Sequence, residues 1–315
     1  MRTADGIPSA RRVRNLENKA PRRLSQKSSE AIAAYLFLAP DVIGLFLVYI
    51  VPIAFTIFIS FYSWSGVGSM TFVGASNYEE MFKDPIWLQS LGVTGLYILM
   101  YLPTVVIGSM FLALLTNSRL REQKLYRTIF FFPIVVPMVI AAVVWQLIYE
   151  PSSGGILNYL LGALGIPAQP FLGSSSQALF CVVIVTTWKQ LGYYMIIYLA
   201  GLTDIPKEYT EAAVIDGAGP VKRFFHITLP LLKPIILFVT VVNMVAALQD
   251  FDQIYVLTRG GPNYGTYVQV FYFYEKAFKY LKMGSASAAS TILFLIIFVL
   301  SLLQLKIFKG GEYES

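Results

Sequence analysis

The sequence predicts an all-α integral membrane protein with six transmembrane helices, on the evidence of its composition, its apolar segments and its charge distribution. Of the 315 residues, 56% are hydrophobic and only 13% are charged, and the mean hydropathy is +0.63. A soluble domain of this length does not need so much apolar surface. The composition therefore favours a polytopic membrane protein over a soluble domain.

The chain contains a single cysteine, Cys181, and a single histidine, His226. One cysteine excludes a disulfide or a cysteine-based metal site within the chain. One histidine makes a histidine-based zinc site implausible and leaves little material for a catalytic triad. We therefore expect neither a metal site nor an enzyme.

Residues 1–30 form a basic tail, which we expect to be disordered in the cytoplasm. Eight Lys or Arg residues precede residue 28, and the segment shows no apolar periodicity. Positive charge ahead of an apolar segment favours a cytoplasmic N-terminus, which is a simpler interpretation than nucleic-acid binding. The apolar run that follows is too long for a cleavable signal peptide.

Six apolar segments define a transmembrane domain over 31–309. The first is long for a bilayer that needs about 20 residues, and Pro52 is expected to kink it. Pro133 and Pro137 lie near the start of the third. The expected spans are about 31–62, 91–115, 129–149, 178–202, 234–248 and 286–307.

The charges between the spans place both termini in the cytoplasm. Four Lys or Arg residues crowd 119–127, whereas 150–177 contains none, so the first of these loops is expected inside and the second outside. Lys306 and Lys309 end the last span on the inside. Four Lys or Arg residues within 259–282 lie outside in this topology, but later loops have less influence on orientation.

The loop 203–233, between the fourth and fifth spans, carries the most specific pattern. Pro206 and Pro220 each begin a short helix, at a position where the missing N–H has no cost. Gly217 lies between the two helices and suits a positive φ. A helix–glycine–helix unit of this size forms a rigid knob that can fit a groove on a partner.

The spacing in this loop resembles the EAA loop of ABC importer permeases. In that loop Glu-Ala-Ala is followed after three residues by Gly, and after nine more by Ile-x-Leu-Pro; every fixed position is matched here. The Asp-Gly-Ala core is similar to that of the sugar-importing branch, which includes maltose and glycerol-phosphate permeases. The matching residues are Glu211, Ala212, Ala213, Asp216, Gly217, Ala218, Ile227, Leu229 and Pro230.

Two further segments resemble this family. Val73–Thr94 contains G-x-x-N-Y before the second span, and Val256–Pro262 matches V-L-T-x-G-G-P beyond the fifth. The resemblance implies a multi-pass permease in a bacterial or archaeal plasma or inner membrane. It also implies a second permease subunit, two cytoplasmic ATPases that bind ATP and Mg, and an extracytoplasmic substrate-binding protein.

The chain lacks a Walker-type glycine loop and therefore is not expected to bind ATP by that route. A secondary transporter would need carboxylates in several spans, and a membrane enzyme would need a cluster of His or carboxylate residues. The sequence favours neither class. The expected cargo is a sugar or sugar derivative, with a glycerol-phosphate-like compound or a polyol as the alternative.

Polar and aromatic residues in the fourth and fifth spans are candidates for the substrate pathway. Polar groups are costly at membrane depth and usually face a cavity or a partner, although bonding between helices explains any one of them equally well. Aromatic faces beside amides and carboxylates suit a sugar, and in the family the substrate contacts come from these two spans. The candidates are Trp188, Lys189, Gly192, Tyr193, Tyr194, Asn243, Ala247, Gln249 and Asp250.

Lys189 is a cation within a predicted span, so a compensating group is expected nearby. An ion pair with Asp250 is the preferred hypothesis, because both spans flank the same loop. The alternative is an anionic group of a phosphorylated substrate. Tyr97 and Tyr101, in the second span, could equally belong to an aromatic belt at the membrane interface.

Overall fold

The computed structural model describes residues 26–117, 123–152 and 154–309. Residues 1–25 of the predicted disordered tail 1–30 lie outside the described residues, as do Arg119 and Arg121 of the predicted cytoplasmic loop. The last five residues of that tail, 26–30, are helical, so the prediction of disorder was wrong for them. The described chain is mostly helical and includes a two-stranded sheet. It divides into two units, residues 1–55 and 56–315.

The described part of the first unit is helical. It comprises α2 (Gln26–Leu45), the π-helical turn η2 (Phe46–Ile50) and the start of α3 (Val51–Ile59). The π turn lies in the turn that precedes Pro52, whose ring removes a hydrogen bond and displaces the carbonyl one turn earlier. The kink at Pro52 stays a prediction. Ala33–Ile59 is long and apolar enough to span a membrane.

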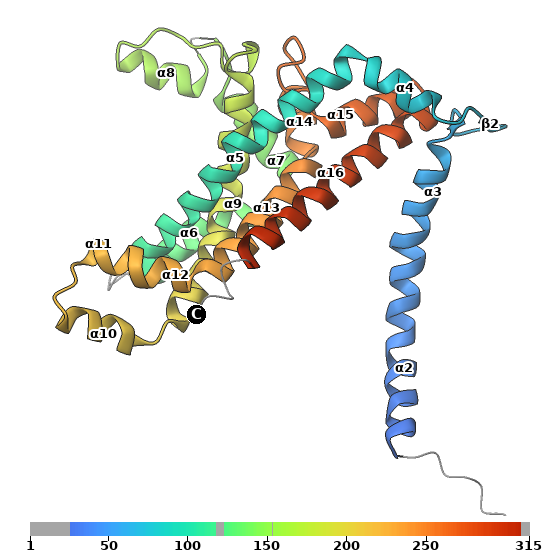
Figure 1. Cartoon of the computed structure of the whole chain (residues 1–315). Coiled ribbons are helices and arrows are strands. Elements are labelled where there is room, and N and C mark those ends of the chain that lie inside the picture. The colour runs from blue at the N-terminus through green and yellow to red at the C-terminus, as the bar shows by residue number, and fades with distance from the viewer. Residues whose placement is uncertain (1–25, 118–122, 153, 310–315) are drawn as a thin grey trace, which may run out of the picture. The chain divides into compact units, whose positions relative to one another are not determined.

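Four long helices form the frame of the described second unit. α5 packs most extensively against α9, and α13 packs against both α5 and α16 (Figure 1). Half of the apolar stretch of α9 is buried inside the protein, compared with 22% for α5 and 28% for α16, so α9 is the central helix. The bounds are α5 Pro85–Asn117, α9 Ala178–Asp204, α13 Lys233–Gln249 and α16 Met283–Lys309.

The third predicted span, 129–149, is not one continuous helix. α6 (Gln123–Val135) and α7 (Met138–Ile148) meet at a bend of 100°. Pro137 stops the helix, because it cannot donate a backbone hydrogen bond and its ring disfavours helical geometry in the preceding residue. The predicted third span is thus occupied by a broken pair of helices, and its role as one span stays a prediction.

By length and composition, four of the described helices can cross a membrane, or up to six if each of two bent pairs is one span. The second bent pair joins Pro220–Leu231 to Lys233–Gln249 at 65°. α13 alone has 17 residues, fewer than the roughly 20 that a bilayer requires. A fifth span of full length therefore needs residues of the helix that precedes α13, beyond the predicted 234–248.

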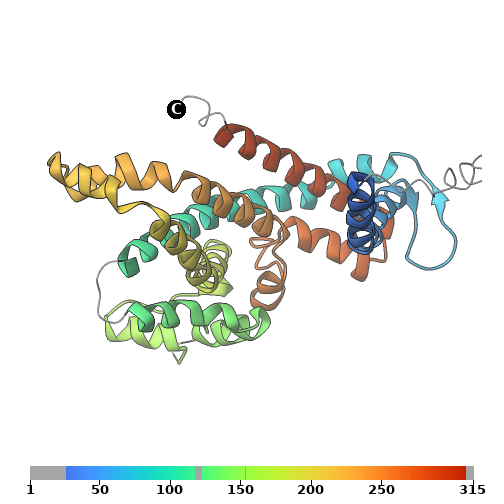
Figure 2. The same cartoon turned by 90° about the horizontal axis from the view of Figure 1, so that it is seen from below.

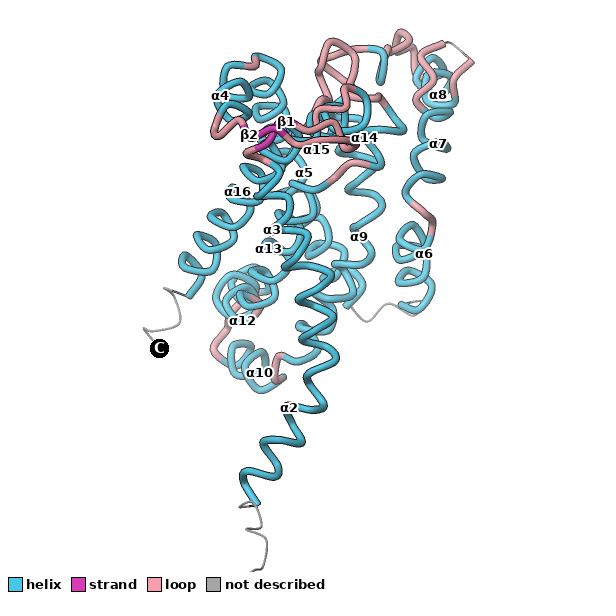
Figure 3. Tube along the Cα trace, turned by 90° about the vertical axis from the view of Figure 1, so that its right-hand side faces the viewer, coloured by secondary structure: helices cyan, strands magenta, loops and turns pink. Residues whose placement is uncertain are grey.

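The short elements of the second unit lie at opposite ends of its long helices (Figure 1). Figure 3 shows the loops gathered mainly at the end with α4, α8 and α14. This end carries β1 (Tyr62–Ser63) paired antiparallel with β2 (Thr71–Phe72), α4 (Ser76–Lys83), α8 (Ile156–Ala163), η3 (Phe171–Gly173), α14 (Asp252–Leu257), α15 (Gln269–Tyr274) and η5 (Glu275–Lys279). The opposite end carries the loop 203–233 and the end of α16.

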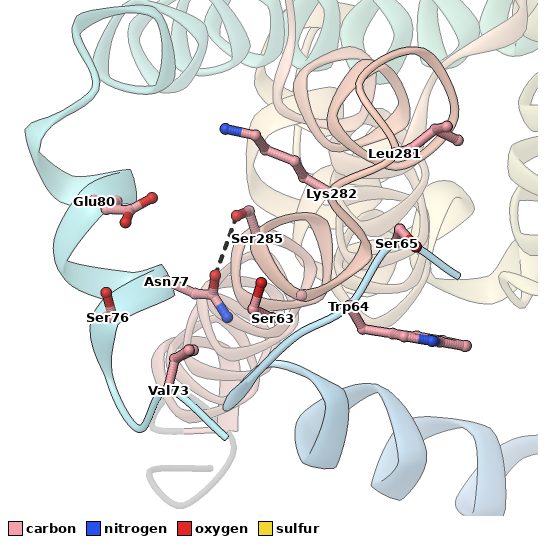
Figure 4. Close-up of a pocket in the computed structure, with 11 residues that line it drawn as sticks. Ser63, Trp64, Ser65, Val73, Ser76, Asn77, Glu80, Leu281, Lys282 and Ser285 are labelled. Carbon is pink, nitrogen blue, oxygen red and sulfur yellow. Dashed lines mark hydrogen bonds between the residues drawn. The ribbon is translucent and has the colours of Figure 1, made fainter. Parts of the chain in front are cut away.

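Asn77 fastens α4 to its neighbours at the first of these ends. Its Nδ2 donates to the carbonyl oxygens of Ser60 (2.8 Å) and Tyr62 (3.0 Å), and its Oδ1 accepts from the Ser285 hydroxyl (3.2 Å). Figure 4 shows this contact in a hollow of ≈ 310 Å³ between α4 and the start of α16. The buried amide is thus fully used, which explains the asparagine of the G-x-x-N-Y segment.

Candidate functional site

The loop 203–233 folds as a helical hairpin. Its first arm, α10 (Lys207–Ile215), follows Pro206 and ends at Gly217, whose φ is +74°. The Gly217 N–H donates to the Val214 carbonyl at 3.0 Å, and the Ala218 N–H donates to the Ala213 carbonyl at 2.8 Å. This pair of bonds is a Schellman motif, in which glycine avoids the steric cost of a Cβ. The predicted positive φ at Gly217 is confirmed.

The second arm begins at Pro220, as predicted, and is helical up to Leu231. It contains α11 (Pro220–Arg223), the π turn η4 (Phe224–Thr228) and α12 (Leu229–Leu231). The break of 65° follows at Leu232, which is fully buried. The motif residues divide between the arms: Glu211, Ala212 and Ala213 lie on α10, Asp216, Gly217 and Ala218 in the turn, and Ile227, Leu229 and Pro230 on the second arm.

The base of the hairpin is tightly packed. A Cβ at Gly201 of α9 would collide with the side chain of Ile235 of α13 and would lie 3.1 Å from that of Leu232. The two helices that flank the hairpin therefore touch where it begins and ends. A displacement of the hairpin reaches both helices through this contact, because packed side chains transmit strain.

The tip of the hairpin exposes apolar side chains. Ile215 is 86% exposed and Val221 is 69% exposed, and Tyr209 and Val214 are also exposed. Figure 2 shows the hairpin projecting away from the other helices of its unit. Apolar groups on a projecting helix pair are typical of a surface that a partner covers.

Lys189 does not pair with Asp250. Its ammonium Nζ donates to the carbonyl oxygens of Pro133 and Ile134, both at 3.2 Å, and to that of Val136. These carbonyls lie at the end of α6, where helix carbonyls lack partners and carry partial negative charge. The predicted ion pair was wrong, because the broken end of α6 satisfies the buried ammonium.

Gly192 lies one turn beyond Lys189 on the same face of α9. A Cβ at this position would collide with the backbone of Phe130 in α6. The glycine therefore lets the two backbones approach closely, as small residues do between membrane helices. Lys189 and Gly192 together fasten α6 to α9, and a substrate contact by either stays a prediction.

Asp250, just beyond α13, accepts a hydrogen bond from the phenol hydroxyl of Tyr97 at 2.5 Å. The same hydroxyl lies 3.2 Å from the Thr186 hydroxyl and accepts from the Gln253 amide at 3.3 Å. The hydroxyl of Tyr97, on α5, therefore links Asp250 to α9 and to the start of α14. Polar groups concentrated within membrane-spanning segments are expected to be bonded to one another or to face a pathway.

Asn243, on α13, extends this network through Tyr101, which lies one turn beyond Tyr97 on α5. It is fully buried, its Oδ1 accepts from the Tyr101 hydroxyl at 2.8 Å, and its Nδ2 donates to the Val239 carbonyl at 2.7 Å. The rings of Tyr97 and Tyr101 are stacked, with centroids 5.7 Å apart. Two predicted candidates, Asn243 and Asp250, are thus joined by a pair of tyrosines.

Residues 82–309 match the family described as "Binding-protein-dependent transport system inner membrane component". The chain belongs to this family. It is therefore a multi-pass inner-membrane permease subunit of an ABC importer, and subunits of this kind are not themselves enzymes.

Named relatives support the same assignment. The permease is 38% identical over 288 residues to "Probable ABC transporter permease protein YurN" of Bacillus subtilis (strain 168), which covers 90% of this chain and 98% of the relative. It is 38% identical over 239 residues to the "sn-glycerol-3-phosphate transport system permease protein UgpA" of Yersinia pestis, covering 76% and 80%.

The fold is also that of a chain in a "bacterial ABC transporter involved in the import of the acidic polysaccharide alginate". The TM-score is 0.81 at 22% identity, and the match covers 90% of the permease and 97% of that chain. At this identity the likeness is one of fold. The predicted permease architecture is therefore supported by a solved structure.

The remaining candidates of the permease do not form one site. Trp188 packs edge-on against Trp145 at 5.6 Å, and Tyr193 lies against Tyr194 at 5.0 Å. Ala247 is buried, whereas Gln249 is exposed. The structure thus joins Asn243 and Asp250 in one network and Lys189 and Gly192 in a second.

The sequence did not assign Tyr97, Tyr101, Thr186 or Gln253 to this network, and the two tyrosines are its aromatic members. Their spacing of four residues, on one face of a helix, was a usable signal. An interface belt was the competing interpretation, but both rings are almost fully buried. Among the described residues of the permease, no group of three or more His, Cys, Asp and Glu could hold a metal ion.

Proposed function

We propose that the permease carries a sugar or sugar derivative that an extracytoplasmic binding protein delivers. The observation that carries this proposal is the hairpin, which presents the complete motif of the sugar-importing branch on a projecting helix pair. A glycerol-phosphate-like or polyol cargo is the second candidate, favoured by the 38% identity to the relative named for sn-glycerol-3-phosphate transport.

The proposed topology has six spans over 31–309, with the tail 1–30 and the C-terminus in the cytoplasm. The hairpin contains several basic residues, and the end of α16 lies at the same end of the unit (Figure 1). The segment 154–177 has no Lys or Arg and includes α8, at the opposite end. Basic residues concentrate on the cytoplasmic side, so this distribution supports the orientation.

In this proposal the hairpin binds one of two cytoplasmic ATPases. Its exposed tip, with Ile215 and Val221, supplies apolar surface for a groove on the partner. Movement of the ATPase displaces the hairpin, and the contact of Gly201 with Ile235 passes the displacement to α9 and α13. A second permease subunit would complete the pathway, and these helices would then change its access from one side to the other.

The polar network supports a pathway role for α13. Asp250 and Asn243 offer a carboxylate and an amide, and the stacked Tyr97 and Tyr101 offer aromatic surface, which together suit hydroxyl groups and the apolar faces of a sugar. Gln249 at the end of α13 and Tyr193 on α9 are exposed, and they are the candidates that a cargo reaches without rearrangement of the core.

The test uses the complete importer, reconstituted in vesicles with its ATPases and binding protein. Glu211→Lys is expected to leave insertion intact but to abolish sugar uptake and stimulated ATP hydrolysis. Ala213→Cys is expected to crosslink to the ATPase after Cys181 has been replaced. Normal uptake with Glu211→Lys, together with no crosslink, would refute the coupling role.

A further inference from the structure

Two hollows flank Arg259, at the end of the unit opposite the hairpin. One, of ≈ 450 Å³, is lined by Arg259 and by residues of α14, α15 and η5. The other, of ≈ 440 Å³, lies between α7 and α14. Tyr255 and Arg259 line both hollows, so their side chains stand between them.

The backbone of Arg259 adopts a conformation that an arginine rarely takes. Its φ is +51°, and its N–H donates to the Ile254 carbonyl at 2.9 Å, at the end of α14. Glycine or asparagine takes such a position at lower energy. Strained positions of this kind are concentrated at functional sites. The backbone of the turn does not favour arginine here, so the reason for this residue lies in its side chain.

The guanidinium of Arg259 has no hydrogen bond or ion pair with any residue that the structure describes. The other charges of the first hollow are matched: Lys279 binds Glu275 at 2.7 Å, and Glu275 also accepts from the Tyr267 hydroxyl at 2.6 Å. Arg259 therefore gives the hollow one unmatched positive charge. A guanidinium binds a planar carboxylate or a phosphate through two parallel hydrogen bonds.

Aromatic rings form the wall beside this charge. Tyr255 and Tyr274 meet edge to face at 5.7 Å, and Tyr274 contacts Phe278 at 5.3 Å. Phe278 is 66% exposed, so much of its surface is open to a ligand. Aromatic faces beside a few directed polar groups are the usual lining of a small-molecule site, and here they suit the apolar face of a sugar ring.

We propose that Arg259 and the wall of Tyr255, Tyr274 and Phe278 form an exterior subsite for an anionic saccharide. Arg259 would bind the carboxylate or phosphate, and the rings would cover the sugar. This inference rests on the proposed function, which places this end on the side where cargo arrives. α14 connects the subsite directly to Asp250, so it lies at the start of the proposed pathway.

The test measures probe binding to the complete importer in phosphatidylcholine nanodiscs. The probes are cellobiouronic acid, which carries a carboxylate, and cellobiose, which is neutral, each titrated by saturation-transfer NMR. We expect the acid to bind about tenfold more tightly. Arg259→Gln should remove this preference without changing cellobiose binding, and Phe278→Ala should weaken both probes.

Lys83→Gln is the matched control, because it removes an exposed cation at the same end but outside both hollows. It should leave both affinities unchanged. Basal ATP hydrolysis and the thermal midpoint of each variant show whether the importer is folded. Equal affinities of the wild type for the two probes, or an unchanged preference in Arg259→Gln, would overturn the inference.

Two other occupants give different results. If a lipid phosphate fills the subsite, nanodiscs with phosphatidylglycerol abolish the preference for the acid, whereas a saccharide subsite keeps it. If Arg259→Gln weakens association of the binding protein but leaves probe binding unchanged, the surface is a protein contact and the inference is wrong. Absence of sugar uptake in vesicles would refute the proposed function alone, because probe binding does not require transport.

Discussion

The ammonium of Lys189 lies 3.2 Å from the carbonyl oxygen of Ile134, at the point where α6 stops before its bend. The cation of the fourth predicted span is thus stabilised by hydrogen bonds to the end of a helix rather than by an acid. The bend of the third span and the charge of the fourth are therefore parts of one arrangement.

Lys189→Met is expected to lower the thermal midpoint of the purified importer in nanodiscs. The substitution removes a charged donor from three carbonyl oxygens, of which only that of Pro133 keeps a second donor among the described residues, the Val136 N–H at 3.3 Å. Loss of a charged hydrogen-bonding group costs about 1.5–3 kcal/mol. Lys189→Arg should recover part of the loss. Adding Asp250→Asn should restore nothing, because the two residues do not interact; rescue by that second change would reinstate the ion pair.

Gly192→Ala is expected to weaken the contact between α6 and α9. The new Cβ would collide with backbone atoms of Phe130, which cannot rotate away as a side chain does. Overpacking of this kind costs about 1–3 kcal/mol. Yield of assembled importer and its thermal midpoint are the measurements.

Gly95→Ala is the matched control for Gly192→Ala. Gly95 lies inside α5, and a Cβ there meets nothing within 4 Å. Alanine has the higher helix propensity, so this change should be neutral or slightly stabilising. Equal losses from both substitutions would show that close packing is not the reason for Gly192.

Substitutions at Gly217 test the effect of backbone strain without the effect of steric crowding. A Cβ at Gly217 meets nothing within 4 Å, yet φ is +74°. Asparagine tolerates this region and a β-branched residue does not. We expect Gly217→Asn to retain uptake within about twofold and Gly217→Val to lose about tenfold or more, in line with a strain of about 1–3 kcal/mol. Similar uptake rates for the two variants would contradict this.

Asp84 binds Lys276 at 3.0 Å and accepts the Ile86 N–H at 2.9 Å at the start of α5. Burial raises the pKa of Asp84, but hydrogen bonds from Lys276, from the Ile86 N–H and from Tyr272 outweigh it, so the pKa lies below its ordinary value. A lowered carboxyl pKa means that the stabilisation is complete above the unfolded pKa and is lost as pH falls through the folded one.

Asp84→Asn is therefore expected to destabilise this end of the permease by about 1–2 kcal/mol at pH 7, measured by hydrogen exchange of α15 and the start of α5. The difference from the wild type should be constant from pH 8 to 5 and shrink below the ordinary aspartate pKa of 3.8. Asp84→Ala should be worse, because it also removes the cap of α5. Glu79→Gln, in an exposed pair, should have no effect; a loss equal to that of Asp84→Asn would contradict the assignment.

Local rules of the chain predicted the hairpin well. Pro220 at a helix start and Gly217 after a helix end each follow from the backbone preference of one residue, and the structure places both as predicted. The six apolar segments could also be located from the sequence, because hydropathy depends on composition alone. The bend at Pro137 was not, since a proline inside an apolar run is compatible with either a kink or a break.

Partners distant in the sequence could not be predicted in the same way. Lys189 had an acid available across the hairpin, and charge alone favoured Asp250. The choice between that acid and the end of α6 depends on where the helices cross, which Gly192 controls. Likewise, Tyr97 becomes the donor to Asp250 only because α5 packs along α9 and α13.

The hydrogen bonds from Lys189 to the end of α6 also constrain how the protein is synthesised and inserted. Lys189 follows Val136 by 53 residues, so a ribosome that adds about 5–20 residues each second delivers the ammonium roughly 3–11 s after the bend. Carbonyl oxygens without a donor are not tolerated in lipid. We therefore expect the bend to stay beside water or the insertion machinery until α9 is synthesised, so that α6, α7 and α9 enter the bilayer together rather than one after another.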